Sequence, residues 1–251
     1  MIARLAGREV RAVLFDYGLT LVTFERPAAA LHRAYTDIAA LLAGRGAESI
    51  DAELLLDRVH DVVEEAVRGN ERSGSLAEVD IAGTHRDAYA ALGLRLDDET
   101  LDEVQRIEQD AWAEGMRVAP GVVPTLESLR RGGLRLGLCS NAAWRPASLQ
   151  RQLERLGLDH LLDAVVFSSA VGWRKPSRRI FAAALSALGT AAEATVMVGD
   201  RLREDVLGAQ AAGMLGVLLL EHGGDAGPGD PHSANATLVR LADLPALLGL
   251  G

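Results

Sequence analysis

Residues 10–22 read VRAVLFDYGLTLV, and this stretch decides how the rest of the chain is interpreted. Its apolar run, Val13-Leu14-Phe15, suits a buried strand of a parallel sheet, and the run ends on the carboxylate of Asp16. Open α/β sheets bind their ligands at the carboxyl ends of the strands, so Asp16 is placed to act as a nucleophile or a metal ligand. An aspartate that caps a helix or stabilises a turn is the alternative.

The segment that follows, residues 24–117, has apolar residues at helical spacing and no convincing strand pattern. We expect four helices there, which would form a compact insertion. The predicted helices cover residues 28–42, 51–68, 78–92 and 98–112.

From Pro120 onward, apolar strand patterns alternate with helical ones. This alternation predicts a parallel sheet with right-handed crossovers, that is, an α/β fold with a Rossmann-like, doubly wound sheet. Residues 1–23 and 118–251 would form this catalytic core, and residues 24–117 would form a helical cap. Strands are expected at residues 134–139, 164–167, 195–198, 215–220 and 237–239.

Composition narrows the class of protein. The chain has 251 residues and a net charge of -9, which makes nucleic acid an unfavourable partner. The apolar run at residues 214–220 is too short to span a bilayer, and no secretion leader precedes Val10, so we expect no membrane partner. Cys139 is the only cysteine, which fits a reducing, cytoplasmic location. The sequence gives no indication of the oligomeric state.

Polar side chains end two further predicted strands: Ser140 follows one and Asp200 follows the other. With Asp16, they would converge at one edge of the sheet, where two carboxylates favour a hard cation such as Mg²⁺. Lys175 is the only lysine beside 25 arginines, so a compact point charge is expected at that position. Pro176 follows it at a predicted helix start, whose N–H groups would also face an anion.

Four stretches together resemble the haloacid dehalogenase-like hydrolase superfamily, in the subgroup with a helical cap. They occur in the family's order along the whole chain, and the third and fourth are the most specific. The stretches are VLFDYGLT, CSNAA, GWRKPSRRIF and VGDRLREDVLGAQAAGM.

The resemblance implies that Asp16 is a nucleophile that accepts a phosphoryl group and becomes an aspartyl-phosphate. It also implies Mg²⁺ as the cofactor. The metal would be held by Asp16, Asp200 and the main-chain carbonyl of Gly18.

The resemblance assigns the remaining motif residues to the phosphoryl group. Ser140, with the backbone N–H of Asn141, would bind its oxygens. Lys175 would neutralise charge on that group and on the nucleophile. Asp205 would orient Lys175 or a water on the metal.

Gly18 departs from the family pattern, because phosphatases of this family usually carry a second aspartate two residues after the nucleophile. That aspartate serves as a general acid and base. Loss of a positioned general acid typically costs about 10²–10⁴-fold in rate. The metal site survives the change, since it uses only a backbone carbonyl of residue 18.

The sequence therefore predicts a Mg²⁺-dependent phosphatase of a small phosphorylated metabolite. A haloacid dehalogenase-type hydrolase is one alternative, since a halide needs no acid, but it leaves Asp200 and Asp205 without a role. A weakly active or non-catalytic phospholigand-binding protein is the other. His32, His60 and His85 lie in the predicted insertion, where solvated or partly buried positions are favoured over catalysis.

Overall fold

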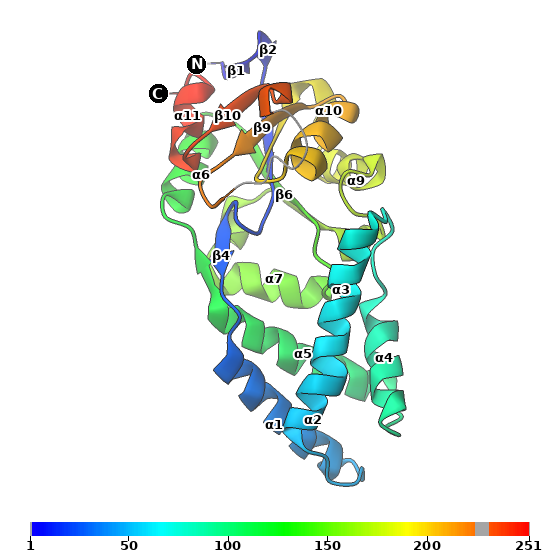
Figure 1. Ribbon diagram of the computed structural model, residues 1–251. Helices are drawn as coiled ribbons and strands as arrows, with labels where there is room; N and C mark the ends of the chain where they lie inside the picture. The colour runs from blue at the N-terminus through cyan, green and yellow to red at the C-terminus, as the bar shows by residue number, and fades with distance from the viewer. Residues whose placement is uncertain (1, 224–230, 251) are drawn as a thin grey trace. The chain divides into compact units, whose positions relative to one another are not determined.

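The computed structural model of the protein describes residues 2–223 and 231–250 (Figure 1). The chain divides into two compact units. The first comprises Met1–Phe24, Arg117–Ala142 and Leu153–Gly251, and the second comprises Glu25–Met116 and Ala143–Gln152.

The first unit is built on a parallel six-stranded sheet with the strand order β10-β9-β8-β3-β6-β7. This arrangement confirms the predicted α/β, Rossmann-like fold. Chain order runs outward from β3 in both directions, so the crossovers reverse there, as at the switch point of a doubly wound sheet. The strands are β3 (Ala12–Phe15), β6 (Arg135–Ser140), β7 (Ala164–Phe167), β8 (Thr195–Gly199), β9 (Leu215–Leu219) and β10 (Ala236–Leu238).

Strand β3 is central because its whole sequence, AVLF, is apolar and completely buried. Its last residue, Phe15, lies level with Leu138 of β6 and Val198 of β8. The three strands therefore end at almost the same height, which brings the residues that follow them to one edge of the sheet.

Helices cover both faces of this sheet. Helix α6 (Val122–Arg131) packs with α11 (Leu244–Leu247) on one side, and α9 (Arg178–Leu188) packs with α10 (Gly208–Ala211) on the other (Figure 1). The core under α9 joins apolar side chains of the helix to those of the strands. It includes Ile180, Phe181, Ala184, Leu188, Leu14, Cys139 and Met197.

Several short elements complete the first unit. An antiparallel pair, β1 (Arg4–Leu5) with β2 (Arg8–Glu9), precedes β3, and β4 (Val22–Phe24) pairs with β5 (Met116–Val118). The remaining short helical segments are α8 (Ser168–Val171), η3 (Asp159–Leu161), η4 (Ala192–Ala194), η5 (Leu202–Leu207), η6 (Pro231–Ser233) and η7 (Leu241–Asp243).

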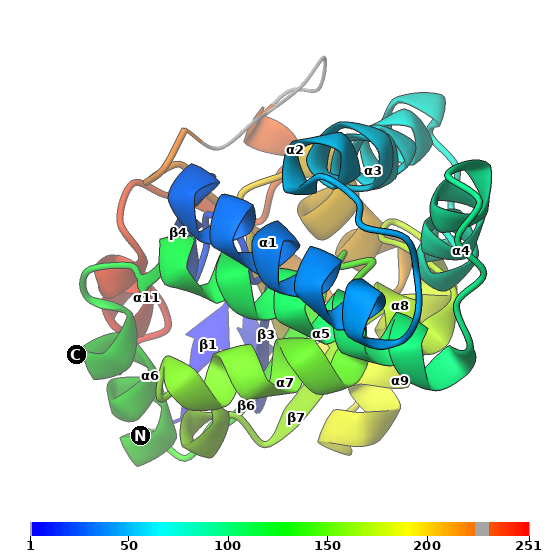
Figure 2. The ribbon, with the colours of Figure 1, turned by 90° about the horizontal axis from the view of Figure 1, so that it is seen from below.

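The second unit is helical. Helices α1 (Ala28–Gly44) and α5 (Asp98–Trp112) pack side by side (Figure 2). The predicted helix at residues 51–68 is a continuous run of α2 (Ala52–Leu55), η1 (Leu56–His60) and α3 (Asp61–Ser73). The unit also contains α4 (Ile81–Ala91), the short segment η2 (Ala113–Gly115) and the first part of α7 (Pro146–Arg155).

Residues 143–152 group with the helices, whereas we expected them with the sheet. Ala143 and Trp144 pack against Val63 of α3 and Ile81 of α4. The side chain of Gln152 donates a hydrogen bond to the main-chain oxygen of Gln109. The assignment of the two units as catalytic core and cap stays a prediction.

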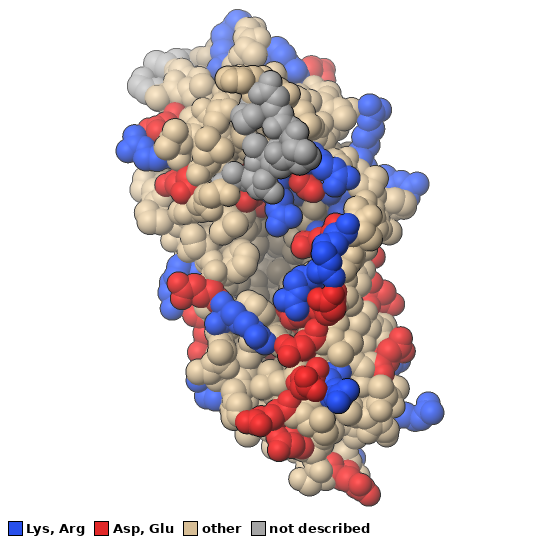
Figure 3. Space-filling model, in the orientation of Figure 1, with Lys and Arg blue, Asp and Glu red and all other residues tan. Residues whose placement is uncertain are grey.

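Acidic and basic side chains are interspersed on the face drawn in Figure 3. Along α3, Arg68 and Arg72 pair with Glu64 and Glu65. Within residues 2–223 and 231–250, the helices are all too short or too polar to cross a bilayer.

Candidate active site

The carboxyl end of β3 carries Asp16, whose backbone N–H donates to the carbonyl of Val198 on the neighbouring strand. Its side chain accepts two hydrogen bonds on one oxygen, Oδ1. Ser140 Oγ donates across 2.9 Å and Lys175 Nζ donates across 2.6 Å. The structure thus brings together a carboxylate, a hydroxyl and an ammonium that lie 124 and 159 residues apart in the chain.

Lys175 is buried and bridges two carboxylates. Its Nζ lies 2.6 Å from Asp16 Oδ1 and 2.6 Å from Asp205 Oδ1. Burial alone lowers the pKa of a lysine, but the charges of the two aspartates outweigh burial and raise the pKa of Lys175 above its usual range. The side chain is therefore a permanent cation within the site.

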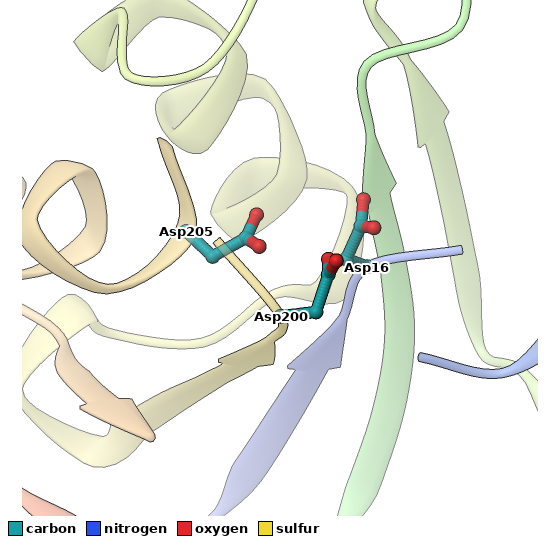
Figure 4. A group of neighbouring side chains, drawn as sticks. All are labelled: Asp16, Asp200 and Asp205. Carbon is teal, nitrogen blue, oxygen red and sulfur yellow. The ribbon is translucent and has the colours of Figure 1, made fainter. Parts of the chain in front are cut away.

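Three carboxylates gather around this lysine. Oxygens of Asp16, Asp200 and Asp205 lie within 4.8 Å of one another (Figure 4). Burial and the charge of Asp16 raise the pKa of Asp200 to about 7. Burial also raises the pKa of Asp205, to about 6, because the favourable effect of Lys175 offsets it only in part.

The charges of these four side chains indicate whether a divalent metal fits the site. When all three carboxylates are ionised, Lys175 neutralises only one of them, and the charges of Asp16 and Asp205 add to the effect of burial in raising the pKa of Asp200. Oxygen donors of this kind suit a hard divalent cation, which would relieve the repulsion. The residues present therefore fit a divalent metal, and two of them, Asp16 and Asp200, lie at the ends of neighbouring strands (Figure 4).

Asp205 is held by the segment that follows β8. Its Oδ2 accepts a hydrogen bond from the backbone N–H of Arg201 at 3.0 Å, while its Oδ1 faces Lys175. Gly199 makes this position possible, because a Cβ at residue 199 would collide with the Asp205 carboxylate. The glycine is thus required by the close approach of another residue's side chain.

The side chain of Asn141 has a contact that the sequence did not predict, while the role expected of its backbone N–H stays a prediction. Its side chain clamps the main chain of Lys175: Oδ1 accepts from the Lys175 N–H at 2.7 Å, and Nδ2 donates to the Lys175 carbonyl at 3.2 Å. The expected helix start at Pro176 is too early. Helix α9 begins at Arg178, and the Ser177 side chain accepts a hydrogen bond from its first turn, so its N-terminus is capped by the chain itself.

Comparison with known proteins follows from this geometry. The family described as haloacid dehalogenase-like hydrolase matches residues 10–213, which contain every residue of the site. The chain belongs to this family.

Relatives of known structure share the fold of this haloacid dehalogenase-like hydrolase over nearly its whole length. A phosphatase of the family from Thermococcus onnurineus is 27% identical, with a TM-score of 0.61 over 96% of this chain and 98% of that one. A 2-haloacid dehalogenase from Pseudomonas syringae pv. Tomato DC3000 has a TM-score of 0.65 over 96% and 98% of the two chains. At 24% identity, this second likeness concerns the fold alone.

Among curated relatives, a glyceraldehyde 3-phosphate phosphatase from Methanothermobacter thermautotrophicus is 42% identical over 104 residues. The match covers 41% of this chain and 45% of the relative. The chain thus aligns with less than half the length of this curated relative.

Gly18, the position that departs from the family pattern, lies at a turn. Leu19 adopts a φ of 59°, a left-handed conformation, and the chain then returns so that Val22 bridges back to Gly18. A Cβ added to Gly18 would meet the Phe24 ring at 3.1 Å from Cε1. Gly18 itself has no left-handed φ, so space rather than backbone conformation limits the side chain at this position.

Two histidines of the helical unit, His60 and His85, belong to a buried polar cluster within that unit. His60 and His85 are completely buried, and both contact the buried carboxylate of Glu108, at 2.5 Å and 2.9 Å. Burial raises the pKa of Glu108, but hydrogen bonds from the two histidines outweigh burial and lower that pKa to about 2. His32 is exposed. His60, His85 and Glu108 therefore form a buried cluster, which joins the helical segments η1, α4 and α5.

Proposed function

We propose that this hydrolase is a Mg²⁺-dependent phosphatase of a small phosphorylated metabolite and that it works through an aspartyl-phosphate. The observation that carries the proposal is the convergence of Asp16, Ser140 and Lys175 with the carboxylates of Asp200 and Asp205. This set combines a nucleophile, two donors for phosphoryl oxygens and an oxygen-rich cation site. The name of the curated relative supports a phosphorylated substrate of small size.

The first half of the proposed reaction belongs to Asp16. Its carboxylate attacks phosphorus, an O–P bond forms, and the bond to the leaving oxygen breaks with its electron pair. Ser140 and Lys175 donate to the phosphoryl oxygens as charge builds on them. Both already converge on Oδ1 of the nucleophile, so they are placed beside the reacting centre before substrate binds.

A divalent metal, when bound, would supply positive charge that offsets the repulsion between a phosphate dianion and the carboxylates. Asp16, Asp200 and the carbonyl of Gly18 are the groups we assign to it. Asp205 keeps the Lys175 ammonium in place through its 2.6 Å contact. In the second half of the reaction, water attacks the aspartyl-phosphate, which releases inorganic phosphate and restores the Asp16 carboxylate.

A haloacid dehalogenase-type reaction is the competing proposal, and the absence of a carboxylate at Gly18 favours it. The excess negative charge around Lys175 argues against it, because a halide-releasing site gains nothing from a cation-binding cluster. The third possibility, a phospholigand-binding protein without turnover, would retain the same donors.

A substrate screen separates these proposals. The purified chain is assayed for phosphate release from sugar, alkyl, aryl and acyl phosphates with Mg²⁺ or with excess chelator, and for halide release from a 2-haloacid. We expect phosphate release that requires Mg²⁺ and disappears in Asp16→Asn. Halide release without phosphate release would establish the dehalogenase instead, and binding of phosphate esters without either product would establish the non-catalytic protein.

A further inference from the structure

Phe24 lies next to the one position where this site departs from the family pattern. The ring is 49% exposed, which is unusual for phenylalanine. Its Cε1 lies 3.1 Å from the point where a Cβ of residue 18 would stand, closer than such contacts normally are. The ring therefore occupies the space into which a carboxylate at residue 18 would begin to extend.

Main-chain hydrogen bonds fix the turn that carries Phe24 toward Gly18. The N–H groups of Leu21 and Val22 both donate to the carbonyl of Tyr17, at 2.9 and 3.0 Å, and Leu19 N–H donates to the Val22 carbonyl at 2.7 Å. Val22 also bridges to Gly18. The backbone that leads from the nucleophile strand toward Phe24 is thus held by its own hydrogen bonds.

We propose that Phe24 is a specificity-determining residue, which presents an apolar ring to the leaving group and selects phosphoesters with planar, apolar and weakly basic leaving groups. The inference rests on the proposed function and names the substrate class for that same site. In the phosphatases that this chain resembles, the side chain at residue 18 protonates the leaving oxygen. Here the Phe24 ring lies against Gly18 instead, with its Cε1 3.1 Å from the point where a Cβ would stand.

The chemistry of the leaving group follows from this replacement. When Asp16 attacks phosphorus, the P–O bond breaks and the electron pair stays on the leaving oxygen, with no proton supplied from residue 18. A phenolate or a carboxylate carries that charge well, whereas an alkoxide does not. An aryl leaving group also gains contact with the ring, an interaction worth about a tenfold preference in binding.

The experiment combines substitutions at both positions. We would prepare Phe24→Ala, Gly18→Asp and the double variant, together with Gly18→Ala, which adds the Cβ without an acid. Val239→Ala, at another exposed apolar residue of the sheet unit, serves as the matched control. kcat/KM is measured for 4-nitrophenyl phosphate and glycerol 1-phosphate, and thermal melting shows that each variant folds.

We expect the native protein to prefer the aryl ester, and Phe24→Ala to lower that preference by about tenfold. Gly18→Asp should raise alkyl turnover by up to about 10²-fold only when Phe24 is also shortened, because only then has the carboxylate room. Gly18→Ala should improve neither substrate.

Two results would overturn the inference. Equal effects of Phe24→Ala on both esters would show that the ring does not contact the leaving group. Equal alkyl turnover in Gly18→Asp and the double variant would show that the ring does not block an acid. Failure of the proposed function is a distinct result, because the native protein would then release phosphate from neither ester.

Discussion

Replacement of Lys175 by methionine should cost both stability and activity, because its ammonium contacts the carboxylates of both Asp16 and Asp205. Methionine has a similar length and volume but no charge. Removal of one partner from a buried ion pair typically destabilises a protein by about 3–5 kcal/mol. For a chain of this size, that loss corresponds to a fall in Tm of roughly 6–20 °C.

The loss should depend on pH in a definite direction. The pKa values of Asp200 and Asp205 are raised to about 7 and about 6, above the ordinary aspartate value of 3.8. A carboxyl with a raised pKa contributes most stability below its unfolded pKa and loses that contribution as the pH rises through its folded pKa. Lys175→Met removes the compensating charge, so its Tm deficit should be largest at pH 8 and should shrink toward pH 5.

Thermal unfolding in chelator from pH 5 to 8, together with kcat in Mg²⁺, measures both effects. We expect kcat to fall by at least about 10²–10³-fold. Lys175→Arg keeps the charge but should not recover kcat, since a guanidinium cannot replace the compact contacts to two carboxylates. Lys175→Met/Asp205→Asn should recover stability only. Arg131→Met, on the surface, is the matched control. A near-native kcat for Lys175→Arg, or a Tm deficit that does not change with pH, would refute the reasoning.

Three further predictions follow from the same contacts. Because the pKa of Asp200 is about 7, protons compete with a cation there, so the rise in Tm produced by Mg²⁺ should grow from pH 6 to 8 and vanish in Asp200→Asn. The pKa of Glu108 is lowered to about 2 from 4.5, so its ionised form adds about 3 kcal/mol to the free energy of unfolding above pH 4.5, and this contribution is lost as the pH falls toward 2. In Glu108→Gln, the free energy of unfolding measured with urea should therefore change less over that pH range. Asn141→Ala should lower kcat about tenfold with less effect on KM, because the main chain of Lys175 loses its clamp. If kcat falls only in proportion to the fraction of protein that is folded, the role of Asn141 is merely structural.

The fold was predictable because its signal is local and repeated. Each strand of the sheet is a short apolar run bounded by turn residues, and the predicted strand at residues 164–167 coincides with β7. The pair β1–β2 escaped prediction because two residues per strand carry no periodicity. The grouping of residues 143–152 with the helices depends on tertiary packing of Trp144, which spacing in the sequence does not encode.

The meeting of the candidate site residues was predictable for a topological reason, since parallel strands end at one edge of the sheet. The contacts that side chains make at that edge could not be predicted from the sequence. The clamp by Asn141 joins two separate loops, and the space left by Gly199 and the ring of Phe24 each depend on how one turn folds back on itself. The same limit applies to His60, His85 and Glu108. Helical spacing predicts the helix face on which each residue lies, but not that both histidines contact the buried carboxylate of Glu108.

The lone lysine shows how composition and geometry constrain the same position. Arginine serves at 25 other places, many of them exposed and paired with a single carboxylate. Lys175 instead contacts two carboxylate oxygens of different residues, each at 2.6 Å, inside the protein. The tetrahedral donors of an ammonium diverge and can reach both, whereas the parallel donors of a guanidinium match the two oxygens of one carboxylate. A cation that must face Asp16, Asp205 and an incoming phosphoryl group is therefore a position where even a chain this rich in arginine requires lysine.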